Sequence, residues 1–478
     1  TIKLDGNYPT GTENTALGDT ALDSVEAGGN YNVVLGSKAG TNITTGDSNV
    51  GVGAYALCDA TTNSQNVAIG TESLKKNTAS NNTAVGYISL TCNTSGASNT
   101  AVGANALDAN TTGACNTAVG TSALTTNTTG IRNVSIGHQS LQANTTGGYN
   151  IGLGFQPLYS NSTASNNVAL GYQSLYYNTT GDANTAVGRS SMVANTTGDN
   201  NVAVGQNSLV SNTTASENTA VGNSALCLNT TGANNTAVGS GSLYTNTTGA
   251  CNVAVGRCAL VSNTTASNNT AVGQSSLAAN TTGEETTALG FKALTSNTTA
   301  DYNVAIGACS LCSNTTGTSN VGVGTSSLKC NTTASNNTAV GQNALVLNTG
   351  ANNTAHGAYA LAANTTASDN TAVGFCSLYT NTTGCLNTAT GRHSLLANTT
   401  GNCNTAIGLS ALRCNTTASN NTAVGMNSLV SNTTGASNVA VGSCALNSNT
   451  TGANNTAVGY QSLCTNITGA TNTSVGWC

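Results

Sequence analysis

The chain has 478 residues and a formal net charge of -5, and only 6% of its residues are charged and 4% aromatic. Its 11 Lys and Arg residues are scattered, which argues against a surface that binds nucleic acid through phosphates. No run of about 18 apolar residues is present, so no membrane-spanning helix is predicted. The first nine residues do not resemble a signal peptide.

From Asn14 onward one unit repeats, Asn-Thr-Ala-Val-Gly-x-x-Ser-Leu-x-x-Asn-Thr-Thr-Gly-x-Asn. It opens 28 times between Asn14 and Asn472, nearly always with a period of 17, as from Asn99 to Asn116. A fixed short period predicts a solenoid, in which each copy contacts only its neighbours. We expect residues 1–13 to form a lead-in or cap and residues 14–478 to form one continuous repeat domain. Because the chain stops within a repeat, we also expect it to be a fragment of a longer protein.

Positions 2 to 4, counted from the first Asn of each copy, predict a short strand because they are rich in β-branched residues. Side chains alternate along a strand, and we place positions 2 and 4 in the core. Position 9 is mostly Leu and is predicted to meet them from a second short strand. The inward core residues predicted in this way are Val102, Val119, Ile136, Leu107 and Leu124.

Position 5 is Gly in every copy, from Gly18 to Gly476. Such a glycine marks a backbone that needs positive φ or passes too close to a neighbour for a Cβ atom. The structural turn glycines predicted here include Gly103, Gly120, Gly137, Gly171 and Gly188. Positions 12 to 17 contain Asn and Gly, which favour turns. Two copies are one residue shorter and lack a Thr in this segment, as expected for a surface turn.

A helix does not fit beside two strands and two turns in so short a unit. The sequence therefore predicts an all-β fold, a parallel β-solenoid or β-roll of about 28 coils with two short strands per coil. At about 4.8 Å per coil, such a solenoid is a stiff rod roughly 130 Å long.

Asn recurs at positions 1, 12 and 17, and we expect these columns to stack amide on amide between coils. The alternative is that Asn only supplies turn conformations, and both can hold. Thr286 interrupts the column at position 1, where we expect a weak point. The ladder residues predicted are Asn99, Asn116, Asn133, Asn110 and Asn127.

The Asn-Thr-Thr segments also match the acceptor pattern for N-glycosylation. In a secreted eukaryotic protein they could carry glycans, whereas in a bacteriophage they would be bare turn residues. The acceptor residues predicted on this pattern are Asn110, Asn127, Asn144, Asn178 and Asn195.

The 16 cysteines show no metal-binding spacing. Residues one repeat apart, or one repeat and one residue, lie on adjacent coils, so disulfides could join Cys312 to Cys330 and Cys385 to Cys403. Free thiols are the alternative interpretation.

The sequence predicts no enzyme, no cofactor and no metal site. His138, His356 and His393 have no matched carboxylate or nucleophile nearby, and a thin repeated coil offers no pocket for acid–base catalysis. His356 occupies position 4 and is therefore predicted to be a satisfied core side chain.

Position 3 is predicted to face outward, yet it is mostly Ala and otherwise almost always Ser or Gly. A solvent-facing column would contain larger polar residues, so we interpret position 3 as packing against another chain. The alternative is that a tight coil leaves no space there. Positions 6, 7, 10 and 11 vary and are predicted to form the presented surface, with Tyr172, Tyr176, Lys329, Arg392 and Arg413.

The motif Asn-Thr-Ala-Val-Gly, found at residues 116–120, resembles the head repeats of trimeric autotransporter adhesins, which form left-handed parallel β-rolls of three chains. The longer unit, Asn-Thr-Thr-Gly at 110–113 followed by 116–120, is similar to repeats in marine bacteriophage tail fibres. The opening residues 1–9 are similar to phage fibre sequence too. The resemblance implies a homotrimer on a virion or cell surface that contacts a host receptor or glycan. On this basis we expect a structural fibre shaft, spacer and attachment element.

Three other functions stay open. The chain could be a self-assembling glycosylated extracellular filament with end-to-end contacts, a bacterial surface adhesin stalk, or an ice-binding solenoid that uses the Thr columns at positions 13 and 14. All these interpretations expect an extracellular or virion-surface protein without a nucleic-acid partner.

Overall fold

The computed structural model describes residues 11 and 13–477, so most of the predicted lead-in segment lies outside the described residues. The described residues form 28 strands of three residues each and no helix. Contacts divide the chain into two units, residues 1–235 and residues 236–478.

The strands of the first unit are β1 (Thr15–Leu17), β2 (Val33–Leu35), β3 (Val50–Val52), β4 (Val67–Ile69), β5 (Thr83–Val85), β6 (Thr100–Val102), β7 (Thr117–Val119), β8 (Val134–Ile136), β9 (Ile151–Leu153), β10 (Val168–Leu170), β11 (Thr185–Val187), β12 (Val202–Val204) and β13 (Thr219–Val221). Those of the second unit are β14 (Thr236–Val238), β15 (Val253–Val255), β16 (Thr270–Val272), β17 (Thr287–Leu289), β18 (Val304–Ile306), β19 (Val321–Val323), β20 (Thr338–Val340), β21 (Thr354–His356), β22 (Thr371–Val373), β23 (Thr388–Thr390), β24 (Thr405–Ile407), β25 (Thr422–Val424), β26 (Val439–Val441), β27 (Thr456–Val458) and β28 (Thr473–Val475).

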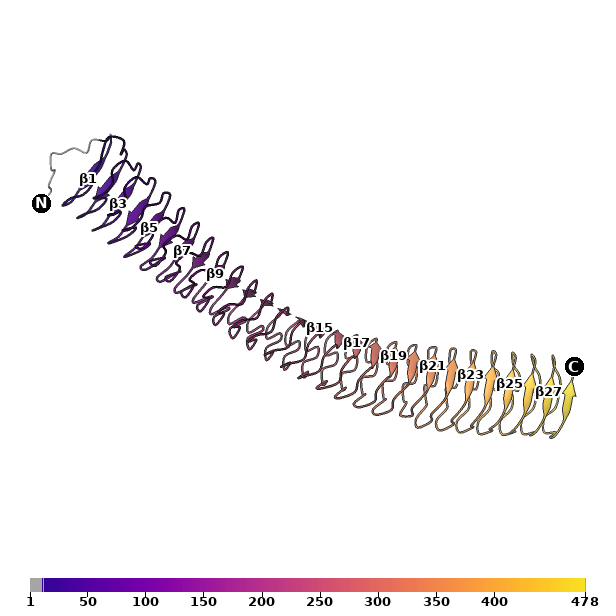
Figure 1. Ribbon diagram of the computed structural model, residues 1–478. Coiled ribbons are helices and arrows are strands. Elements are labelled where there is room, and N and C mark those ends of the chain that lie inside the picture. The colour runs from indigo at the N-terminus through magenta and orange to yellow at the C-terminus, as the bar shows by residue number, and fades with distance from the viewer. Residues whose placement is uncertain (1–10, 12, 478) are drawn as a thin grey trace. The chain divides into compact units, whose positions relative to one another are not determined.

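Within each unit, every strand pairs in parallel with the strand of the next coil (Figure 1). Paired residues hold the same repeat position, so Ala101 of β6 lies opposite Ala118 of β7. The predicted all-β parallel β-solenoid, with one copy of the repeat in each coil, is confirmed. The two shorter copies keep this register, with Val67 opposite Thr83 and Thr338 opposite Thr354, because the missing residue comes from a turn.

The second strand predicted for each coil is not formed in the described residues. Leu107 and Leu124 at position 9 both have a φ of 52°, and Asn105 at position 7 has a φ of 57°. Strands need an extended backbone with negative φ, so this segment forms turns instead. It still bonds to the next coil, because the Leu107 N–H donates to the Ala123 carbonyl at 3.0 Å.

The side chains of each strand point opposite to the prediction. Ala101 at position 3 is fully buried, whereas Val102 and Ile136 at position 4 are 36% and 38% exposed and Val119 is half-buried. The placement of these three residues in the core was therefore wrong. Leu107 and Leu124, by contrast, are fully buried.

The coil is thin, and this explains the small residues at position 3. Gly51 occupies that position in β3, and a Cβ atom built on it would lie 3.5 Å from Leu57 Cδ1, in van der Waals contact. An Ala methyl group thus fills the space between the strand and the position-9 Leu. The column of Ala residues is small because the coil is tight, and its interpretation as an interface between chains was wrong.

Glycine at position 5 is required both by its positive φ and by the close approach of the next coil. Gly103, Gly120, Gly137, Gly171 and Gly188 have φ values of 136°, 135°, 128°, 138° and 128°, which side chains rarely adopt. Close approach adds to this, since a Cβ atom on Gly103 would lie 2.5 Å from the Gly120 carbonyl oxygen.

We expect Gly205→Ala to lower the free energy of unfolding by at least about 2 kcal/mol, because the backbone is strained for Ala and the coils must separate. Gly205 has a φ of 131°, and its Cβ atom would lie 2.6 Å from the Gly222 carbonyl oxygen. Hydrogen exchange followed by mass spectrometry measures local opening of these coils.

Gly241→Ser is the matched control. Gly241 lies at position 7 with a φ of 67°, where an added Cβ atom would be 3.8 Å from the Cys258 Sγ atom. Other coils place Ser there with similar φ, as at Ser122 and Ser224. Equal effects of the two substitutions would contradict the role assigned to close backbone approach.

Candidate functional site

In most coils from the one that opens at Asn82 onward, two buried Asn side chains cross the interior and share one backbone carbonyl. Earlier coils have Ile43 and Ala60 at position 12 instead of Asn. In the coil that opens at Asn99, the Nδ2 atoms of Asn99 and Asn110 both donate to the Gly113 carbonyl, at 2.8 and 3.0 Å. Asn110 Nδ2 also donates to Asn93 Oδ1 of the preceding coil at 2.7 Å. The Asn116 backbone N–H, in the next coil, donates to Asn99 Oδ1 at 2.9 Å.

These bonds recur through the described coils and make two ladders. The column at position 12 is joined amide to amide, as Asn127 Nδ2 donates to Asn110 Oδ1 at 2.8 Å. The column at position 1 is joined mainly through the backbone, as the Asn133 N–H donates to Asn116 Oδ1 at 2.9 Å. Asn200, at position 17, is exposed and takes no part in such a ladder. The ladders give most of the buried amides hydrogen-bond partners. Asn421 Nδ2 is a buried exception that has no partner among the described residues.

The buried ladder is incompatible with N-glycosylation at position 12. Glycans attach to the Asn side-chain nitrogen, and here that atom is fully buried and donates two hydrogen bonds. Asn195 Nδ2, for example, donates to Asn178 Oδ1 at 2.8 Å and to the Gly198 carbonyl at 3.0 Å. The predicted acceptors, all with no exposed surface, are Asn110, Asn127, Asn144, Asn178 and Asn195. In this fold they are structural residues.

Thr286 replaces Asn at position 1 and keeps only part of the network. Its N–H donates to Asn269 Oδ1 at 3.0 Å, and its hydroxyl donates to the Glu284 carbonyl at 3.0 Å. Among the described residues, Thr286 provides no acceptor for the Asn303 N–H. The weak point that the sequence predicts therefore has a structural basis, and its effect on stability stays a prediction.

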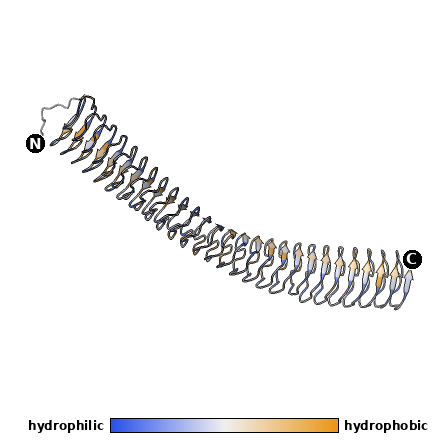
Figure 2. Ribbon diagram, in the orientation of Figure 1, coloured by the Kyte–Doolittle hydropathy of each residue, from blue (hydrophilic) through white to orange (hydrophobic). Residues whose placement is uncertain are grey.

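The outward side chains at positions 2 and 4 of the strands form a surface that we call the strand face. Figure 2 shows that the strands carry more hydrophobic colour than the turns. The large apolar residues of this face that are at least 36% exposed are Leu17, Val33, Ile69, Val102, Ile136, Ile151, Leu153, Val221, Val238, Leu289, Ile306, Val373, Ile407, Val439, Val441 and Val475.

No Asp, Glu, Lys or Arg occurs at positions 2 or 4 of the 28 described strands, which contain Thr, Val, Ile and Leu with a single His. Solvent-exposed sheet faces and edges normally carry charges that discourage association. His356 is exposed on this face, so its placement in the core was wrong. The sequence interpretation missed this surface because it assigned the wrong side of the strand to the core. The absence of charged residues at positions 2 and 4 was visible in the sequence.

Neither predicted disulfide is formed, and Cys312, Cys330, Cys385 and Cys403 are free thiols. The members of each pair occupy successive repeat positions rather than one column, 10 and 11 in the first pair and 16 and 17 in the second. Cys312 Sγ donates instead to the Lys329 carbonyl at 3.8 Å. Burial and the adjacent Cys309 thiol raise the pKa of Cys312, which disfavours its reactive thiolate.

The hydroxyls of the turn Thr residues at position 13 are used inside the protein. Thr111 Oγ1 donates to the Thr128 carbonyl at 3.1 Å, and Thr128 Oγ1 donates to the Thr145 carbonyl at 3.1 Å. One of the two Thr columns proposed for ice binding therefore has its donors engaged along the solenoid. Position 14, such as Thr112, is exposed.

Positions 6, 7, 10 and 11 form the variable face. Lys329, Arg392 and Arg413 are exposed on it, Tyr172 is 47% exposed, and Tyr176 is half-buried. Aromatic residues in successive coils stack along this face. The ring centroids of His138 and Phe155 are 5.3 Å apart, those of Phe155 and Tyr172 5.4 Å, and those of Tyr159 and Tyr176 4.9 Å.

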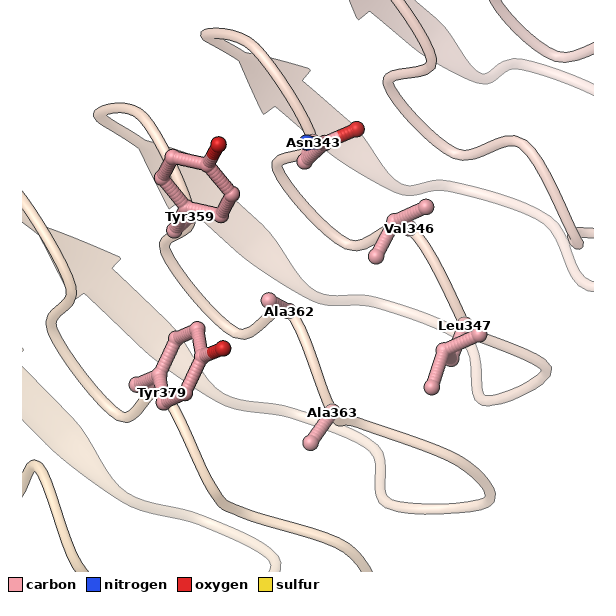
Figure 3. A pocket seen from close by; sticks show the side chains of 7 residues that line it. All are labelled: Asn343, Val346, Leu347, Tyr359, Ala362, Ala363 and Tyr379. Atoms are coloured by element: carbon pink, nitrogen blue, oxygen red, sulfur yellow. The ribbon is translucent and has the colours of Figure 1, made fainter.

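A shallow hollow of about 310 Å³ lies on the variable face of the second unit. Figure 3 shows Tyr359 and Tyr379 on one side, Val346 and Leu347 on the other, and Ala362 and Ala363 between them, with Asn343 beside the Tyr359 wall. The hollow exists because one coil has two Ala residues where the flanking coils have larger side chains. The sequence interpretation missed the hollow. Its signal is the pair of Ala residues at positions 10 and 11 between two copies that have larger residues there.

No protein-family model matches the chain, and no curated protein is significantly similar to it. Within the described residues, no three His, Cys, Asp or Glu side chains are grouped so as to hold a metal ion. No helix in that part of the chain is long and apolar enough to cross a membrane. The two outer faces of the solenoid are therefore the candidate functional surfaces.

We expect Thr286→Asn to stabilise its coil by about 1 kcal/mol, because it supplies the missing acceptor for the Asn303 N–H. The Asn303 amide should then exchange its hydrogen about fivefold more slowly. Asn201→Thr is the reciprocal variant, since Asn201 Oδ1 accepts from the Asn218 N–H at 3.0 Å. It should accelerate exchange at Asn218 by a similar factor. Unchanged exchange in both variants would contradict the ladder's contribution to stability.

Proposed function

We propose that the protein is a structural fibre shaft and spacer of a virion tail fibre or cell-surface filament, whose copies associate side by side through the strand face. The observation that supports this most is the strand face itself. It repeats along every described coil, exposes apolar side chains such as Ile151 and Leu153, and contains no charged residue. Large exposed apolar surfaces of this kind usually mark sites of association.

The occupant that fits this face is a second copy of the chain. Val and Thr rows recur at the spacing of adjacent strands, about 4.8 Å. A partner with the same repeat can match these rows coil by coil, and symmetric self-association is the usual form of oligomer. We favour a homotrimer, which the resemblance to adhesin heads and phage fibres suggests. The strand face takes over the interface role that the sequence interpretation gave to position 3.

A shaft of this kind acts through length and stiffness. Each coil adds about 4.8 Å, and most of its backbone bonds connect it to its neighbours, as in the Thr100 N–H donating to the Asn116 carbonyl at 2.8 Å. The proposal includes an extracellular or virion-surface location and attachment to a host receptor or glycan. It includes neither catalysis nor a cofactor.

Light scattering on the purified chain tests the assembly. A trimer of a 47.0 kDa chain has a mass of about 141 kDa, and we expect this value. A variant with Ile136→Glu, Leu153→Glu and Leu170→Glu places three stacked charges on the strand face. We expect its assembly to weaken at least tenfold, because buried like charges repel and lose their hydration.

The control variant carries the same three charges on the variable face, as Ala143→Glu, Ser160→Glu and Tyr177→Glu, and should keep the wild-type mass. A wild-type mass of 47.0 kDa would contradict self-association. Equal weakening by both variants would contradict the use of the strand face.

A further inference from the structure

The hollow between Tyr359, Tyr379 and Leu347 has features of a binding site rather than of a packing defect. The coil that opens at Asn269 has the same pair of small residues at positions 10 and 11, Ala278 and Ala279, but its position 7 is Ser275. Aromatic walls therefore distinguish the hollow from an ordinary gap in the variable face.

The walls of the hollow are two aromatic rings and an exposed Leu side chain. The ring centroids of Tyr359 and Tyr379 are 6.4 Å apart and their planes are inclined by 65°. The two rings therefore form two inclined walls of the hollow. Tyr359 is held in turn by Phe375, at 6.2 Å and nearly perpendicular. Tyr379 is 38% exposed and Leu347 is 47% exposed, so ligand-accessible apolar surface lies on both sides of the Ala floor.

Polar groups in the hollow lack partners within the protein. The hydroxyls of Tyr359 and Tyr379 and the side-chain amide of Asn343 make no hydrogen bond among the described residues, although each lies at the hollow. No acidic or basic side chain lines it. Its chemistry is apolar ring surface combined with neutral donors and acceptors.

We propose that this hollow binds one ring of a neutral saccharide. A pyranose has an apolar face of C–H groups that can pack against a Tyr ring, and hydroxyls that can bond to the Asn343 amide and the Tyr hydroxyls. The absence of charge selects a neutral sugar over an acidic one. The site is open and shallow, so a single copy binds weakly, and binding to a surface glycan gains from several copies acting together.

This inference rests on the proposed function, because it assigns the attachment part of the shaft to one place. It does not depend on the strand face, since the hollow is built from positions 7, 10 and 11. Self-association and saccharide binding can therefore fail separately, and the two experiments report on different surfaces.

Saturation-transfer difference NMR on the full chain tests the proposal, with cellotetraose, maltotetraose and N-acetylchitotetraose as probes. We expect ring-proton signals from at least one probe. Ala363→Leu fills the hollow and should reduce these signals at least fivefold, and Tyr379→Ala should reduce them through loss of a wall. Ala279→Leu, the same substitution at the same repeat position without Tyr walls, should leave them unchanged.

Far-ultraviolet circular dichroism shows whether each variant keeps the wild-type fold, so a loss of folding is not mistaken for a loss of binding, and light scattering reports the mass. Absence of signal with all three probes would overturn the proposal, as would equal binding by Ala363→Leu and the wild type. Binding of N-acetyltyrosinamide that none of the sugars displaces would also overturn it and would assign the hollow to an aromatic peptide. A monomeric wild-type mass with intact sugar signals would remove self-association only.

Discussion

The structure depends on the hydrogen bonding of Asn side chains that are buried inside nearly every coil. A coil built from one short repeat encloses little apolar volume, and Asn at positions 1 and 12 takes up much of it. Each of these amides must find partners, because a buried unpaired amide costs about 1–3 kcal/mol. The partners are a turn carbonyl in the same coil and groups in adjacent coils, as Asn110 shows with Gly113 and Asn93. One coil is therefore incomplete by itself, and the network explains why the repeat propagates with so little variation.

The same interior limits where function can reside. The residues that point inward are Ala, Leu, Ser and Asn in nearly every coil, with glycine where neighbouring backbones meet. Only outward positions are free to differ. The strand face varies little from coil to coil and contains no Asp, Glu, Lys or Arg. Such a face is suited to contact with a second copy of the chain, which has the same repeat spacing. The variable face differs much more from coil to coil, and it contains the aromatic stacks and the hollow beside Tyr359. The surfaces that we propose for assembly and for recognition are therefore separate faces of one repeated coil.

The repeat period, the absence of helices and the parallel strands were all predictable, because repetition and the length of the unit leave few alternatives. The direction of the strand side chains was not, since Thr-Ala-Val alternates equally well in either orientation. Limited space favours the smaller residue at position 3, where a Cβ atom on Gly51 would already touch Leu57 Cδ1. Val34 of β2 is a larger side chain that is buried there as an exception. The turn at Leu107 was not predictable either, because an apolar residue with positive φ is rare and position 9 looks like a strand. The hollow depends on side chains from three coils, which no single copy of the repeat reveals.

Electron cryo-microscopy of the assembled chain examines the fold and the assembly together, because it shows both the inside of a coil and what covers its outside. We expect Ala side chains enclosed against Leu, Asn ladders along the interior, and the Val and Thr rows of one copy lying against those of another. Single copies with a bare strand face would contradict the proposed assembly. Ala side chains on the outer surface would contradict the architecture from which it was derived.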